Sequence, residues 1–163
     1  MNYALLLIAF AAGSAISTQA AVNSQLAGGL HGNTVAAALV SFVIGTTALA
    51  IIAFSKGGIA AAVINLPSQP LWRFSGGLLG AAAIFSTVLL APRIGLANML
   101  ALVIAGQLLT SMAIDHFGLI GMITRRVSGV RLLGASVLLA GVSITLFGDS
   151  LLKLLVKPTG AMS

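Results

Sequence analysis

Carboxamide side chains are the most prominent chemically capable groups in a chain that is otherwise almost entirely apolar. Gln19, Asn23 and Gln25 lie close together near the end of the first apolar run. A serine or threonine hydroxyl can return its hydrogen bond to its own helix, whereas a carboxamide does so less easily. We therefore interpret these three amides as candidate substrate contacts. The alternatives are hydrogen bonding between helices and a position at an interfacial helix end.

A second polar series lies further along the chain and contains Asn98, Gln107 and Ser111. Gln107, Ser111 and Asp115 recur at four-residue steps, so a helix would place them along one face. Such a face could line one side of a cavity. We predict that Asn98, Gln107 and Ser111 contact a substrate through neutral hydrogen bonds.

Asp115 and His116 are adjacent ionisable residues at the end of the same apolar run. Their chemistry would suit a proton or cation site. The alternative is an ordinary helix end at which Asp115 pairs with Arg125 or Arg126. The cost of about 3 kcal/mol for a carboxylate at the membrane centre favours this second interpretation.

Enzymatic constellations are absent from the sequence. There is no cysteine, which excludes thiolate nucleophiles and Cys-ligated metal sites. His31 and His116 are isolated, Asp149 precedes Lys153 by four residues and predicts a local ion pair, and no phosphate-binding glycine loop with a lysine occurs. We expect a protein that is not an enzyme and that binds no cofactor and no metal.

The composition requires lipid as the solvent for most of the chain. Of the 163 residues, 59% are hydrophobic and 6% are charged, and the mean hydropathy is +1.14. A soluble domain carries about 25% charged residues. The net charge of +6 comes from cations scattered between apolar runs, which indicates membrane-flanking residues and argues against nucleic-acid binding. One transmembrane domain over residues 1–163 fits this composition.

The apolar runs predict an all-α membrane protein with five transmembrane helices. A bilayer core about 30 Å thick needs about 20 apolar residues per helix. Residues 59–66 are too short to cross and precede Pro67 and Pro70, so a six-span alternative is disfavoured. The opening residues lack a positive n-region, so we expect the first run to be a permanent span. The predicted spans are about 3–26, 34–54, 74–91, 95–114 and 132–152.

Small residues recur at four-residue spacing and predict close helix packing at Gly13, Gly45, Gly76 and Gly80. In lipid, such residues let helix backbones approach one another. The alternative is that these spacings only reflect abundance, because the chain contains 19 glycines.

The distribution of cations gives a weak orientation signal. With five spans, the side that holds the N-terminus carries five cations and the opposite side carries three. The positive-inside rule then favours a cytoplasmic N-terminus, but the bias is small enough to allow insertion in both orientations. The five are Lys56, Arg73, Arg125, Arg126 and Arg131, and the three are Arg93, Lys153 and Lys157.

Several phrases together resemble the YdcZ-type family of inner-membrane exporters, a branch of the drug/metabolite transporter superfamily. The most specific stretch runs from Gly106-Gln107 to Asp115-His116-Phe117-Gly118, and the resemblance extends over nearly the whole chain. Two further phrases are Pro70-Leu71-Trp72 and Ala91-Pro92-Arg93-Ile94-Gly95-Leu96-Ala97.

The resemblance implies a helical bundle similar to the small multidrug resistance fold with one added helix. It also implies a homodimer, in some members antiparallel, in the bacterial inner (cytoplasmic) membrane. Small multidrug resistance proteins use a glutamate in their first span, and this chain has no glutamate. Proton-coupled export of cations by that mechanism is therefore not expected.

We expect a multi-pass secondary transporter that exports a small polar or amphiphilic molecule as a dimer by alternating access. Its partners would be the lipid bilayer and the small-molecule substrate. The alternative is a non-transporting membrane subunit that stabilises a larger complex. Under that alternative the small-residue rows would matter and the amides would not.

Overall fold

The computed structural model describes residues 2–155, with side chains through residue 152, and this part of the chain contains helices and no strand. This range contains six α-helices, five of which are long. Their bounds are α1 Tyr3–Gly29, α2 Thr34–Lys56, α3 Ile59–Asn65, α4 Ser75–Ile94, α5 Leu96–Phe117 and α6 Gly129–Leu155, with short 3-10 turns at Leu66–Ser68, Leu71–Phe74 and Leu119–Gly121.

Five segments of the described chain are long and apolar enough to cross a membrane, which confirms the predicted all-α membrane architecture. The remaining α-helix, α3, has only seven residues. At 1.5 Å per residue it is about 10 Å long, far short of the roughly 30 Å hydrocarbon core. The spanning segments are Tyr3–Gly29, Thr34–Lys56, Leu71–Ile94, Leu96–Phe117 and Gly129–Leu152.

All five spanning helices end later than expected from the sequence, and α6 also begins earlier. Local backbone geometry accounts for the end of α4 and the start of α6. α4 continues through Pro92 to Ile94, because the chain leaves the helix only at Gly95, whose φ is +83°. α6 begins at Gly129 instead of residue 132. Its start is capped by Ser128, whose Oγ accepts a hydrogen bond from the Arg131 N–H at 3.4 Å.

The turn between α1 and α2 depends on two residues with left-handed backbone conformation. His31 has a φ of 55° and Gly32 a φ of 79°. The Gly32 N–H bonds the Ala27 carbonyl at 2.8 Å, and the Asn33 side chain accepts from Ala36 N at 2.9 Å. These bonds satisfy polar groups at both helix ends and reverse the chain within a few residues.

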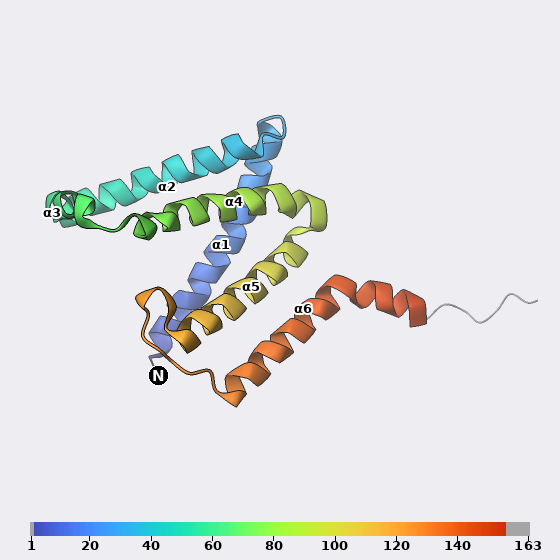
Figure 1. The fold of residues 1–163 in the computed structure, drawn as a ribbon. Helices are drawn as coiled ribbons and strands as arrows, with labels where there is room; N and C mark the ends of the chain where they lie inside the picture. Colours follow the sequence, from blue (N-terminus) through green and yellow to red (C-terminus); the bar gives the residue numbers. More distant parts are fainter. Residues whose placement is uncertain (1, 156–163) are drawn as a thin grey trace, which may run out of the picture. The chain divides into compact units, whose positions relative to one another are not determined.

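The chain forms two compact units, one of residues up to Leu96 and one from Ala97 onward. In the first unit, α1, α2 and α4 pack against one another in pairs, and Figure 1 shows α2 and α4 running alongside each other. Their shared core consists of Ala27, Ala37 and Val88. Because two of these side chains are methyl groups, the three helices can approach closely.

In the second unit, the segment after α5 folds back onto the end of that helix. The Arg125 N–H bonds the Asp115 carbonyl at 2.7 Å, and the Val127 N–H bonds His116 Nδ1 at 3.2 Å. The return is made by left-handed residues at Gly118, Ile120 and Gly121. α6 begins shortly afterwards and provides the fifth spanning segment.

The glycines predicted to pack helices differ in their surroundings. A Cβ added at Gly80 on α4 would lie 3.9 Å from Cζ of Phe42 on α2. The same atom at Gly13, Gly45 or Gly76 would meet nothing within 4 Å in the described chain. Gly80 therefore faces a neighbouring helix, and packing at the other three stays a prediction that would need a second chain.

Gly80→Leu should lower the free energy of unfolding by about 1–3 kcal/mol, because the added side chain must displace the Phe42 ring. Gly77→Leu is the matched control, on the same helix three residues away, with open space at its Cβ. Unfolding of the purified variants in detergent measures both. Equal losses in the two variants would contradict the contact between α4 and Phe42.

Candidate functional site

Asn23 is the one polar residue that the described structure buries. Its side chain is 5% exposed and lies on the same face of α1 as the buried Ala20 and Ala27. The Nδ2 atom has no hydrogen-bond partner among the described residues. A buried donor left without a partner costs about 1–3 kcal/mol, and in hydrocarbon no water can supply the missing acceptor.

A polar pocket of about 470 Å³ lies at the end of the first unit where α1 ends, α2 begins and α4 ends. Its volume is within the range of small-molecule sites. The walls combine apolar residues with the polar residues Ser24 and Thr34 and the cationic Arg93. The lining residues are Ser24, Ala27, Gly28, Gly32, Thr34, Val88, Leu89, Pro92 and Arg93.

Asn23 lies next to this polar pocket along α1. Ser24 follows it directly, and Ala27, one turn later on the same helix face, belongs to the pocket wall. Asn23 is therefore about 6 Å further into the span than Ala27, at 1.5 Å per residue. A molecule that entered the polar pocket and extended along α1 would approach the unpartnered amide.

Ser24 differs from the other serine and threonine residues of α1. Ser14, Ser17 and Thr18 each donate to the carbonyl four residues earlier, at 2.9 to 3.2 Å. The Ser24 hydroxyl makes no hydrogen bond to any residue of the described chain, although it is half-buried. Its hydroxyl is therefore available to a molecule in the pocket.

The three amides of α1 occupy different environments. Gln19 donates from Nε2 to the Ser41 hydroxyl on α2 at 3.4 Å, so it takes the interhelical alternative considered above. Gln25 is exposed, on the side of α1 away from the buried face. Only Asn23 combines burial with a missing partner, and a substrate role for Gln19 and Gln25 stays a prediction.

The polar series of α5 lies in the second unit. Asn98 is half-buried, whereas Gln107 and Ser111 are exposed. The Ser111 hydroxyl donates to the Leu108 carbonyl at 2.9 Å, which is the backbone return that a serine can make in a helix. Their role in substrate contact stays a prediction.

Asp115 and His116 are half-buried at the end of α5. His116 Nδ1 accepts from the Val127 N–H, and its ring packs edge-on against Phe117 with centroids 4.8 Å apart. Asp115 forms no ion pair with Arg125 or Arg126 within the described chain. The Arg125 main-chain N–H bonds the Asp115 carbonyl instead, so this helix end is fastened by backbone bonds.

Two further expectations concern the ion pair at the end of α6 and metal binding. The predicted ion pair of Asp149 with Lys153 falls outside the described side chains. Within residues 2–155, no group of three histidine or acidic side chains is placed to hold a metal ion.

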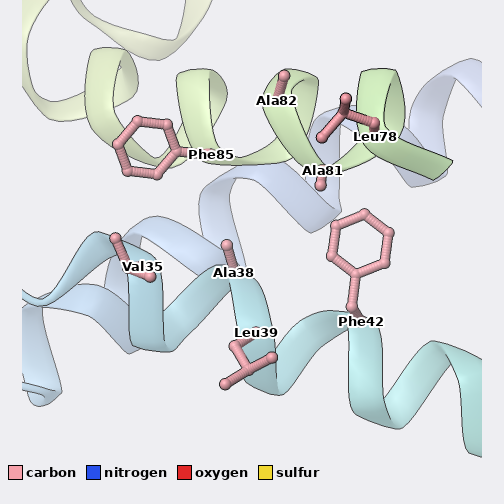
Figure 2. Close-up of a pocket in the computed structure, with 8 residues that line it drawn as sticks. All are labelled: Val35, Ala38, Leu39, Phe42, Leu78, Ala81, Ala82 and Phe85. Carbon is pink, nitrogen blue, oxygen red and sulfur yellow. The ribbon is translucent and has the colours of Figure 1, made fainter. Parts of the chain in front are cut away.

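A second cavity, the apolar groove of about 450 Å³, lies between α2 and α4. Figure 2 shows Phe42 and Leu39 of α2 on one side and Phe85, Ala82 and Leu78 of α4 on the other. Its wall is almost free of polar atoms, so it offers no hydrogen bonds to a polar molecule. The remaining lining residues are Val35, Ala38 and Ala81.

Sequence reasoning did not find Ser24, Thr34 and Arg93 as a group. They are scattered along the chain, and the turn at His31 and Gly32 is needed to bring the first two together. A usable signal was the absence of any Asp or Glu before Asp115, which leaves Arg93 without an acidic partner in its own unit.

The family model described as "Putative inner membrane exporter, YdcZ" matches residues 4–144, from the second residue of α1 to the first part of α6. The chain belongs to this family. No curated protein and no solved structure matches it. Membership and the five spanning helices make it a multi-pass membrane protein of a family described as exporters, which favours a transporter over an enzyme.

Asn23→Leu should raise the free energy of unfolding by about 1–3 kcal/mol, because a side chain of similar size replaces a buried donor that has no partner. Gln19→Leu is the control on the same helix. Its exposed bond to Ser41 should contribute less than about 1 kcal/mol, in line with hydrogen bonds between membrane helices. Unfolding in detergent measures both variants, and a loss of stability in Asn23→Leu would show that Nδ2 is partnered.

Proposed function

We propose that the chain is a secondary transporter that exports a small polar or amphiphilic molecule across the bacterial inner membrane. The observation that carries the proposal is the buried, unpartnered Asn23 amide beside the polar pocket. Helix packing alone would favour an apolar side chain at this position, because the unused donor is costly in hydrocarbon. A cargo that accepts this hydrogen bond recovers the cost only while it is bound.

The hydrogen-bonding groups suit an uncharged or zwitterionic cargo better than a strong cation. Asn23 and Ser24 offer neutral groups, and the chain has no glutamate with which to bind a cation in its first span. Gln107 and Ser111 on α5 are the further candidates for neutral contacts. Asp115 and His116 are the candidates for proton coupling.

A homodimer is the proposed working unit. Transporters commonly bind cargo near the bilayer midplane between repeated units that rock against each other. Gly13, Gly45 and Gly76 leave open helix surface on α1, α2 and α4, to which a second copy could pack closely. The small difference in cation number between the two sides is compatible with an antiparallel pair. The bilayer and the cargo are the other proposed partners, and nucleic acid is not one.

In reconstituted vesicles, Asn23→Ala and Gln107→Ala should each reduce transport at least tenfold, because each removes a proposed cargo contact. A thermal-shift screen of the purified protein against uncharged and zwitterionic metabolites supplies the cargo, since a ligand that prefers the folded state raises the melting temperature. Uptake or release of that radiolabelled compound is then measured.

Asn65→Ala is the control for the transport assay. Its carboxamide is exposed on α3 and donates to the Ala61 carbonyl of its own helix. This variant should transport normally. Unchanged transport in both Asn23→Ala and Gln107→Ala would remove the cavity assignment. Copurification with a larger complex and no transport would favour the scaffolding alternative.

Reporters fused to both termini should locate each terminus on both faces of the membrane if the dimer is antiparallel. Fluorescent and enzymatic reporters that are active on opposite faces give this measurement in cells. Adding two lysines to one loop should shift the population toward one orientation, because the intrinsic bias is small. A single orientation in the unaltered protein would eliminate the antiparallel homodimer.

A further inference from the structure

Arg93 belongs to a unit that has cations and no acidic residue. The sequence contains no Asp or Glu before Asp115, so the first unit carries Lys56, Arg73 and Arg93 without a carboxylate. Arg93 forms no ion pair within the described chain. A guanidinium has five donors in a planar fork, which matches phosphate and carboxylate groups in a bidentate manner.

The local charge of the polar pocket is positive even when the helix ends are counted. α1 and α4 end at the pocket and each contributes about half a negative elementary charge, whereas the start of α2 contributes about half a positive one. Adding the full charge of Arg93 leaves a net positive charge of about one half. No acidic side chain lines the pocket to cancel it.

The neutral groups of the pocket complement this charge. Ser24 and Thr34 line it, and neither hydroxyl forms a hydrogen bond to another residue of the described chain. Two half-buried hydroxyl residues and the exposed Arg93 therefore line one cavity of about 470 Å³. Hydrogen bonds from a charged donor to an oxyanion are about twice as strong as those between neutral groups.

We propose that the polar pocket binds an anionic group, a phosphate or a carboxylate, with Arg93 as the counter-charge and Ser24 and Thr34 as hydroxyl donors. This inference rests on the proposed function and narrows the cargo to molecules with an anionic end, zwitterions included. The rest of such a molecule lies toward Asn23, about one helical turn further into the span. The same chemistry would also hold the phosphate of a phospholipid headgroup.

The test measures anion binding to the purified full chain in a neutral detergent. The probes are inorganic phosphate, glycerol 3-phosphate, acetate and dihexanoyl phosphatidylglycerol below its micelle concentration, with sodium chloride at matched ionic strength as the blank. Calorimetry gives the dissociation constant, and melting temperature gives an independent signal. The soluble anions and the lipid distinguish a free cargo from a headgroup.

Arg93→Gln should weaken binding about tenfold or more, as expected for the loss of a charged hydrogen-bonding partner. Arg73→Gln is the matched control. It removes the same charge from the same unit, but Arg73 bonds Gln69, lies 5.6 Å from the Trp72 ring and does not line the pocket. Its effect should stay below about twofold.

Arg93→Lys and Ser24→Ala keep the test decisive if Arg93→Gln does not fold. The lysine retains the charge but loses the fork, so binding should weaken less than in Arg93→Gln. Ser24→Ala should weaken binding about threefold, through loss of one neutral hydrogen bond. Equal affinity in the unaltered chain, Arg93→Gln and Arg73→Gln, or no binding of any anion above the chloride blank, would overturn the inference.

The outcomes separate this inference from the proposed function. Transport of a neutral compound without anion binding would overturn the anion site and leave the exporter intact. Anion binding that depends on Arg93, in a chain that moves no compound in vesicles, would support the site and overturn the exporter. Binding of phosphatidylglycerol alone would support the site with a lipid as its occupant.

Discussion

The absence of water in the bilayer core is the constraint on which the rest of this structure depends. Every backbone group within a span must find a partner inside its own helix, and polar side chains must find one in their own or a neighbouring helix. Ser14, Ser17 and Thr18 satisfy this rule by donating to their own helix, and Gln19 satisfies it through α2. Asn23 does not: its buried Nδ2 has no partner in the described chain, and this cost supports the proposed role of the amide in cargo binding.

Small side chains decide where the polar groups of the first unit meet. Ala27 and Ala37 let α1, α2 and α4 pack closely around Val88. The same approach brings together the end of α1, the start of α2 and the end of α4, which form the polar pocket. The apolar groove lies between α2 and α4 and is lined by residues of both helices (Figure 2). One helix pair therefore borders two cavities of opposite character.

The two units divide the chemistry of the chain. All acidic residues follow Ala97, whereas the unit before it is purely cationic and holds the buried amide. At the end of α5, His116 fixes the following segment through Val127, and Asp115 does so through its carbonyl. Asp115 and His116 therefore have a structural role, which is separate from the proton coupling proposed for them. The proposed cargo site therefore rests on Asn23 and Arg93 of the first unit.

The sequence alone determined the five spans, because run length and hydropathy are local properties that can be compared directly with the thickness of a bilayer. Its characteristic phrases, such as Gly106-Gln107 to Gly118, indicated the exporter family. It also found Asn23, but not what separates it from Gln19 and Gln25. That difference depends on which side of α1 packs against α2 and α4. Because α1 is apolar on nearly all sides, its sequence does not indicate which side is buried. Only the tertiary structure could join Ser24, Thr34 and Arg93 in one pocket, since helix pairing is a contact between residues distant in the chain.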